Sequence, residues 1–310
     1  MKTVLLPDNM PYYRANLHCH STVSDGKKSP EELKEYYRDH GYSIIAYTDH
    51  EKLVTHNDLT DDTFLALNGY EAGINEDGDV HWSRRKVCHL CLIAMTPEQT
   101  APVPEDSPRT YRGEWISDFA KNARDAGFFV TYNHPVWSLE SYPQYSTYHN
   151  MNAMEIVNFA CQIEGYDDDN GHCYDDLLRG GERLFCIAAD DNHNAIPDDS
   201  TVCDSFGGYT MIAAESLDYR AVMQSMAQGK FYASSGTSTH VGPMIRSLVY
   251  EDGTVTITTS DVREIAYIPD SRRCYLVHAE DGETIQTASF RVAEDERWFR
   301  LVVVDREGYK

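Results

Sequence analysis

Short apolar runs that end in a histidine or an acid recur along the first two thirds of the chain. Each run is bounded by a turn signal, and this is the pattern of a buried strand. Because helical signals separate several of the runs, the pattern predicts βαβ units and an α/β fold. The runs cover residues 42–50, 64–71, 86–94, 128–135 and 184–193, and further strands are expected over 153–158 and 208–214.

The expected helices have recognisable ends. Residues 29–32 combine an N-cap serine, a proline at the first helical position and two acids in the first turn, and Gly41 is a C-cap signal. Two more helices are expected over 115–126 and 216–228, each followed by a glycine. In α/β barrels the chemistry lies at the carboxyl ends of the strands, so the polar residues that end these strands form the candidate site.

The pattern changes after residue 240. Apolar and polar residues alternate with a period of two, and Asp-Gly pairs at 252–253 and 281–282 mark turns. This predicts a small antiparallel β module of about four strands. We therefore divide the chain into a domain over residues 1–240 and a β-rich module over residues 241–310. The expected strands of the module cover residues 254–258, 274–278, 289–292 and 299–304.

The charge of the chain restricts its partners. The 310 residues carry a formal net charge of -23, which repels nucleic-acid backbones and anionic lipids. We therefore expect neither an extended nucleic-acid surface nor a membrane partner, and a small anionic substrate would need metal ions to invert the local charge. No apolar run is long enough for a signal peptide or a membrane span, so we expect a cytoplasmic protein.

The first candidate ligands lie close together near the amino terminus. His18 and His20 are separated by one residue, so in an extended segment both imidazoles point to the same side. Asp25 follows a serine-rich turn that Gly26 closes, which allows its carboxylate to return over the end of the strand. Two nitrogens and an oxygen suit Zn, Mn or Fe. Two partly buried or surface histidines are the alternative, and the recurrence of the pattern in later segments favours the metal site.

The later segments supply six more candidate ligands. His89 lies among apolar neighbours, where a hydrogen-bonded core histidine is the alternative to a metal ligand. Asp191 and His193 share a face, as the first two histidines do. Six imidazoles and three carboxylates exceed the needs of one tetrahedral metal and suffice for two or three metals if a carboxylate bridges them. The six are His50, Glu71, His89, His134, Asp191 and His193.

The order of these motifs resembles that of the polymerase and histidinol phosphatase (PHP) superfamily. Over roughly residues 12–240 it runs His-x-His with Ser-Asp-Gly, Thr-Asp-His, Glu, His, His-Pro and a final Asp-x-His. The resemblance implies a distorted (β/α)7 barrel with a trinuclear metal site, followed here by the β module. It also implies one metal on His18, His20 and Asp191, a second on Asp25, His50 and His193, a third on His89 and His134, and Glu71 as a bridge.

The same resemblance implies a metal-dependent phosphoesterase. Two or three divalent ions (Zn, Mn or Fe) lower the pKa of a bridging water and neutralise phosphoryl charge, so we expect a bridging hydroxide to hydrolyse a small phosphate monoester. Arg84 and Arg85 lie in the loop between two ligand strands and are candidate phosphate contacts, with two solvated arginines as the alternative. Asp49 and Glu155 are candidates to orient metal-bound histidines or a water, with ordinary capping as the alternative.

Two other functions compete with this interpretation. A PHP-type nuclease or exonuclease would need a basic stripe or an aromatic groove for a strand, and neither is seen in the sequence. A binding module that keeps its metals without turnover is the second alternative, and the complete ligand set argues against it. The sequence assigns neither the identity of the metal nor an oligomeric state.

Overall fold

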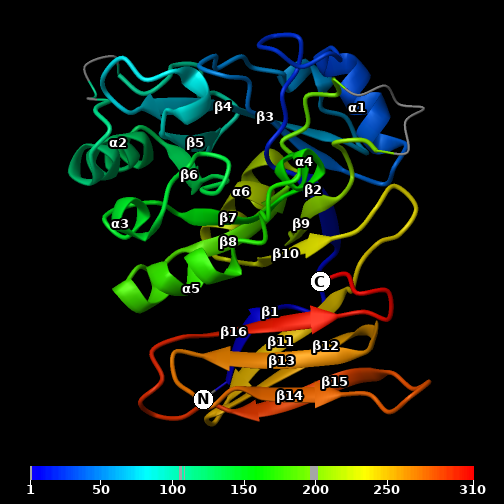
Figure 1. Cartoon of the computed structure of the whole chain (residues 1–310). Coiled ribbons are helices and arrows are strands. Elements are labelled where there is room, and N and C mark those ends of the chain that lie inside the picture. The colour runs from blue at the N-terminus through cyan, green and yellow to red at the C-terminus, as the bar shows by residue number, and fades with distance from the viewer. Residues whose placement is uncertain (1, 105–106, 108, 196–201) are drawn as a thin grey trace.

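The computed structural model describes residues 2–104, 107, 109–195 and 202–310. A barrel-like sheet with its helices forms the larger part of the molecule, and a smaller all-β part packs beside it (Figure 1). Among the described residues no helix combines the length and apolar character that crossing a bilayer requires.

The larger part is built on one nine-stranded sheet in the order β10-β9-β2-β3-β4-β5-β6-β7-β8. Seven strands run in one direction, and only β5 and β9 run against them. This confirms a mixed α/β, barrel-like fold in which the expected alternation is distorted by the antiparallel β4–β5 pair. The strands are β2 (Tyr12–Asn16), β3 (Ile44–Tyr47), β4 (Leu65–Asn75), β5 (Val87–Ala94), β6 (Phe128–Tyr132), β7 (Ala153–Asn158), β8 (Phe185–Ala189), β9 (Gly208–Ala213) and β10 (Phe231–Ser235).

The helices cover the sheet and close its amino end. At the start of α1 the Ser29 hydroxyl accepts from the Glu32 backbone N–H, which confirms the predicted N-cap, and the Glu32 side chain accepts from the Ser29 N–H in return. Val222, Met223 and Met226 of α6 pack into the apolar cluster within the barrel, which leaves the carboxyl ends of the strands for the site. The helices are α1 (Pro30–Arg38), α2 (Gly113–Asp125), α3 (Tyr142–Tyr145), α4 (Phe159–Glu164), α5 (Gly171–Gly180) and α6 (Tyr219–Ala227).

The barrel closes where β8 meets β9. The Thr210 hydroxyl accepts from the Ala188 N–H at 3.2 Å and donates to the Ala188 carbonyl at 2.9 Å, so a side chain replaces the backbone ladder here. A methyl carbon at Gly208 would lie 2.3 Å from the Ala189 carbonyl oxygen, so only glycine permits this approach. Beyond this seam, Cys19 and Asn192 form a parallel bridge that joins the two chain segments carrying the His-x-His and Asp-x-His motifs.

The β module consists of two antiparallel sheets, β1-β11-β12-β15 and β14-β13-β16, around a shared apolar core. It has more strands than the sequence pattern predicted, since β11 and β13 were not expected. Lys2–Leu6 pairs with β11, although the sequence interpretation placed residues 1–240 in the first domain. The strands are β1 (Lys2–Leu6), β11 (Ile245–Glu251), β12 (Thr254–Val262), β13 (Glu264–Pro269), β14 (Tyr275–His278), β15 (Ile285–Arg291) and β16 (Phe299–Val304).

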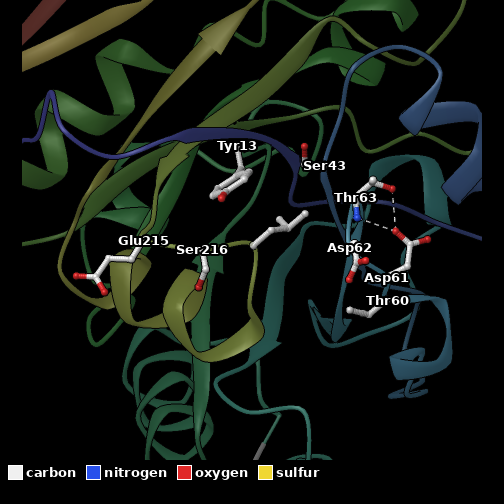
Figure 2. A pocket seen from close by; sticks show the side chains of 9 residues that line it. Tyr13, Ser43, Thr60, Asp61, Asp62, Thr63, Glu215 and Ser216 are labelled. Carbon is white, nitrogen blue, oxygen red and sulfur yellow. Dashed lines mark hydrogen bonds between the residues drawn. The ribbon is translucent and has the colours of Figure 1, made fainter.

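A shallow groove of about 860 Å³ lies at the amino ends of β2 and β3 (Figure 2). Asp61 and Thr63 line one side of it, Glu215 and Ser216 line the other, and Tyr13 lies between them. Asp61 accepts from the backbone and hydroxyl of Thr63, so this carboxylate already has partners. The groove contains no histidine and lies at the opposite end of the barrel from the ligands described below.

We predict that Gly208→Ala lowers the free energy of unfolding by about 1–3 kcal/mol, because the added methyl group forces β8 and β9 apart. Urea unfolding measures the change. Gly180→Ala is the matched control, because nothing lies within 4 Å of the added carbon and alanine at this helical position should be neutral or slightly stabilising. Equal stability of the two variants would contradict the tight seam.

Candidate metal centre

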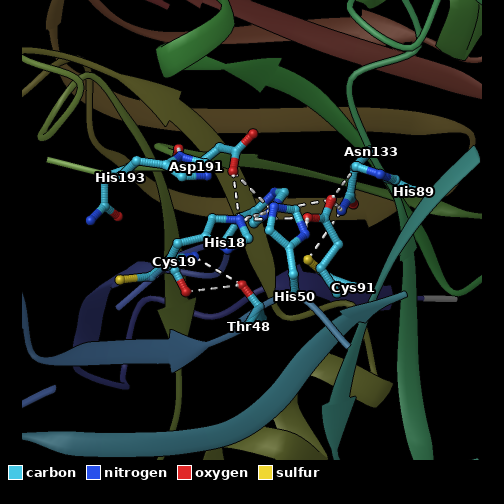
Figure 3. Close-up of polar contacts among 12 residues, drawn as sticks. His18, Cys19, Thr48, His50, His89, Cys91, Asn133, Asp191 and His193 are labelled. Carbon is cyan, nitrogen blue, oxygen red and sulfur yellow. Dashed lines mark hydrogen bonds and ion pairs between the residues drawn. The ribbon is translucent and has the colours of Figure 1, made fainter. Parts of the chain in front are cut away.

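The nine candidate ligands predicted from the sequence, called the ligands below, lie in one continuous cluster at the end of the barrel where the parallel strands have their carboxyl ends. Figure 3 shows five of them, His18, His50, His89, Asp191 and His193, around a common centre. Strand β4 carries Glu71 and β5 carries His89. Asp25 lies in the turn beyond β2, and the others lie within four residues of the ends of β2, β3, β6 and β8. The complete set is His18, His20, Asp25, His50, Glu71, His89, His134, Asp191 and His193.

One group in this cluster has the spacing of a metal site. His18 Nε2 and His20 Nε2 are 3.1 Å apart, and Asp191 Oδ1 lies 3.0 Å from the first nitrogen and 2.9 Å from the second. Three ligand atoms at right angles, each about 2.1 Å from a metal, would be about 3.0 Å apart. Asp191 Oδ1 is buried and accepts no hydrogen bond. These three atoms therefore fit one face of a coordination shell.

Glu71 lies at the middle of the cluster, with its side chain 1% exposed. Its carboxylate oxygens are 3.0 to 3.5 Å from five imidazole nitrogens. Three imidazoles approach Oε1 and two approach Oε2, and Oε2 is buried without a hydrogen-bond partner. Such a carboxylate can serve as a bridge, as the resemblance implied. The five imidazoles belong to His18, His20, His50, His89 and His134.

A third group lies nearer to solvent. Asp25 Oδ1 is 3.5 Å from His193 Nε2, and Asp25 Oδ2 is 3.7 Å from His50 Nε2. The Asp25 side chain is 55% exposed, that of His193 31% and that of His50 34%. His20 belongs to this group as well as to the first, so the groups share ligands. The cluster thus has a buried part and an open part.

Burial and mutual attraction shift the pKa values of the cluster strongly. Burial alone would raise the pKa of Glu71, but the adjacent His89 and His18 hold it well below its usual range. Burial opposes protonation of His134, yet Glu71 and Asp191 raise its pKa to about 9. Burial lowers the pKa of His20 to about 4, although Asp191 acts in the opposite direction. The buried carboxylates therefore require either protonated imidazoles or bound cations beside them to balance their charge.

The outer nitrogens of three ligands are fixed by acceptors behind them. His18 Nδ1 lies 3.1 Å from Glu155 Oε1, His134 Nδ1 lies 3.2 Å from Ser138 Oγ, and His193 Nδ1 lies 3.0 Å from the Asp191 carbonyl. When an outer nitrogen donates, the inner nitrogen presents a lone pair to the centre.

Glu155 and Asp49 act on different parts of the cluster. Glu155 also accepts from the His134 backbone N–H at 3.1 Å, so it fixes both a ligand ring and a ligand backbone. Asp49 accepts from the backbone N–H and hydroxyl groups of Ser21 and Ser24 at 2.8 to 3.0 Å. It therefore shapes the turn that carries Asp25 and contacts no histidine through these bonds.

Two ligands have unusual backbone conformations. Asp191 has φ of 56° and His134 has φ of 25°, values that residues other than glycine seldom adopt. Asp204 accepts from the His193 and Asn194 N–H groups at 2.8 Å, which holds the turn beyond Asp191. Strain kept at such positions is typical of functional sites.

The two arginines expected to contact phosphate lie elsewhere. Arg84 is exposed in a short turn, and Arg85 donates to the Val80 carbonyl at 2.8 Å within the same loop. Neither has a polar contact with the ligand cluster in the part of the chain that is described. Both arginines belong to the β4–β5 hairpin, so their phosphate contact stays a prediction that no contact in the structure supports.

Two other residues lie beside the cluster and were not predicted. Arg109 forms an ion pair with Glu51, the residue after His50. The Trp137 ring lies 5.6 Å from the His89 ring, centroid to centroid. Trp137 follows the His-Pro motif by two residues, which was the only sequence signal for it, and nothing in the sequence connects Arg109 with the site.

No protein-family model and no curated protein matches the sequence. Among solved structures, the chain is similar to a two-domain protein of Bacteroides vulgatus ATCC 8482 that contains a predicted PHP-like metal-dependent phosphoesterase, at 15% identity and a TM-score of 0.45, covering 97% of this chain and 98% of that one. It is also similar to a proposed metal-dependent phosphoesterase of Bifidobacterium adolescentis ATCC 15703. The identity is 14% and the TM-score 0.41, and the match covers 63% of this chain and 93% of that one. Function is therefore inferred below from side-chain geometry.

We predict that Asp49→Ala weakens metal binding at the Asp25, His50 and His193 group by about 10–100-fold and leaves the buried groups loaded. The turn loses the acceptor that holds it, so Asp25 becomes mobile. Metal content after dialysis against increasing chelator measures the effect. Asp62→Ala, an exposed acid at the other end of the barrel, is the control. Uniform loss of metal from all groups would contradict the assignment.

We predict that the metal-free protein is most stable near pH 6.5, the ordinary pKa of histidine. His134 has a folded pKa of about 9, so its stabilisation is complete below pH 6.5 and is lost as the pH rises through 9. His20 has a folded pKa of about 4, so stability also falls as the pH drops from 6.5 towards 4.

Urea midpoints measured across this pH range with and without metal test this profile. Bound metal should remove the loss of stability on the alkaline side, because coordination requires neutral imidazoles. Identical profiles for the loaded and metal-free protein would contradict metal binding at these histidines.

Proposed function

We propose that the chain is a metal-dependent phosphoesterase that hydrolyses a small phosphate monoester. The observation that carries the proposal is the buried Glu71 carboxylate, whose Oε2 has no hydrogen-bond partner while five imidazole nitrogens lie within 3.5 Å of its two oxygens. Nitrogen and oxygen donors at this spacing suit Zn, Mn or Fe.

The residues that would hold the cations form three groups. The first is His18, His20 and Asp191, and the second is Asp25, His50 and His193 with a share of His20. The third is His89 and His134, with Glu71 between the groups as the bridge. When bound, two or three divalent cations would supply a hydroxide nucleophile near neutral pH and neutralise charge on a phosphoryl group.

The protein itself contributes orientation. Glu155 fixes the His18 ring from behind through Nδ1, and Ser138 does the same for His134. Because both ligand rings are almost fully buried, their geometry is set before a substrate arrives.

The open part of the cluster is where a substrate would enter. Asp25, His50 and His193 are the ligands most exposed to solvent, so a phosphate group would reach the cations from their side. The net charge of -23 disfavours a long polyanion, which supports a small monoester over an oligonucleotide.

We predict that His20→Ala loses metal and lowers kcat/KM for p-nitrophenyl phosphate by on the order of 1000-fold. His20 belongs to both the first and the second group, so its removal should affect the cations of both. Metal analysis and initial rates on the same preparations measure both effects. His240→Ala is the control, because His240 pairs with Asp305 far along the chain from every ligand segment.

Three outcomes would contradict the proposal. Full activity in metal-depleted His20→Ala would contradict the role of the cations. Bound metal without turnover of any phosphoester would favour a binding module. Faster cleavage of oligonucleotides than of monoesters would favour a nuclease.

A further inference from the structure

An aromatic ring covers one side of the cluster. Trp137 lies with its ring 5.6 Å from that of His89 at an interplanar angle of 34°, and 5.2 Å from that of His134 at 80°. Trp137 is only partly buried, so part of the indole remains open to solvent. An indole placed against two ligand rings offers a planar apolar surface at the edge of the centre.

An arginine is linked to the strand pair that carries the same histidine, His89. Glu51 Oε1 accepts from the Gly73 backbone N–H at 2.8 Å, and Glu51 Oε2 is ion-paired with Arg109 Nη1. Gly73 pairs directly with His89 across β4 and β5, and a carbon added at Gly73 would lie 3.3 Å from His89 Nε2 and 3.7 Å from Glu51 Oε1. The Glu51 carboxylate, and through it Arg109, is thus positioned beside His89.

This ion pair is more constrained than an ordinary surface pair. Glu51 has φ of 58°, a strained value for a residue other than glycine, while Arg109 remains 35% exposed. Exposed ion pairs add little to stability, so stability alone does not account for the strain. The Arg109 guanidinium also lies 5.1 Å above the Phe119 ring, which limits its orientation. Among the described residues, its only charged partner is Glu51.

The position of Arg109 determines what it can bind. Arg109 is connected to the His89 strand pair only through Glu51, so we place it at a more distant part of a bound ester than the reacting phosphoryl group. A guanidinium forms paired hydrogen bonds with a planar carboxylate, and only one of its nitrogens is engaged by Glu51.

We propose that Trp137 and Arg109 form a leaving-group subsite on the His89 side of the centre, which selects phosphate monoesters of aromatic groups that carry a carboxylate. The inference rests on the proposed function and names its substrate class. The aromatic ring packs against the indole and the carboxylate pairs with Arg109. Hydrolysis adds water across the ester, breaks the phosphorus–oxygen bond and releases the carboxyphenol and inorganic phosphate.

The test compares phenyl phosphate with 3-carboxyphenyl and 4-carboxyphenyl phosphate, with phosphate release as the readout. We expect the wild-type protein to prefer one carboxyphenyl ester by about tenfold in kcat/KM. Arg109→Gln should abolish this preference, mainly through KM, and leave the rate on phenyl phosphate within about twofold. Arg109→Lys should restore only part of it, because an ammonium lacks the planar fork.

Trp137→Leu should raise KM for all three aromatic esters and leave glycerol phosphate unchanged. Arg246→Gln and Trp82→Leu are the matched controls, since Arg246 is exposed on β11 of the β module and Trp82 is 78% exposed on the β4–β5 hairpin. Metal content and thermal unfolding equal to those of the wild-type protein would exclude a general loss of structure in each variant.

The outcomes separate the subsite from the proposed function. Hydrolysis of phenyl phosphate without a preference for either carboxyphenyl ester would overturn the subsite and leave the phosphoesterase intact. An equal loss of activity on all esters in Arg109→Gln would mean that the Arg109–Glu51 pair has only a structural role, and would also overturn the subsite. No hydrolysis of any ester by the metal-loaded protein would overturn the function and the subsite together.

Discussion

The burial of one carboxylate, that of Glu71, among imidazoles is the interaction on which the rest of the structure depends. An ionised carboxylate away from water is unfavourable unless opposite charge or coordination compensates it. Here Asp191 adds a second buried acid to the same cluster, in a chain that is already strongly acidic. The barrel brings histidines from several strand ends to these two acids, and the space between them fits divalent cations.

A second set of acids holds the ligand segments in place without belonging to the cluster. Asp190 accepts from the backbone N–H groups of Phe206, Gly207 and Gly208 at 2.7 to 2.9 Å, which ties the segment before Asp191 to the start of β9. Asp49 and Asp204 act in the same way on the other turns, as described above. Several acids near the centre therefore accept hydrogen bonds from backbone N–H groups and do not face the cluster. These bonds hold the ligand loops in place.

The sequence predicted those features that depend on local pattern and order. Strands that end in a polar residue identified the carboxyl-end site, and the capping residues located the start of α1. The pattern did not predict β1 in the C-terminal sheet, because Lys2–Leu6 is a short edge strand whose partner, β11, lies more than 200 residues later. Arg84 and Arg85 were chosen for nearness in sequence to two ligand strands, but the hairpin carries them outward. Arg109 reaches the site only through tertiary contact with Glu51, which no spacing in the sequence reveals.

Anomalous X-ray diffraction from crystals of the metal-loaded protein, recorded at the absorption edge of the bound metal, tests the central claim most directly. The account predicts strong peaks between Glu71, Asp191 and the surrounding imidazoles, with at least one ion in contact with Glu71. Peaks confined to exposed acids, such as Asp61 and Asp62, with none beside Glu71, would contradict it.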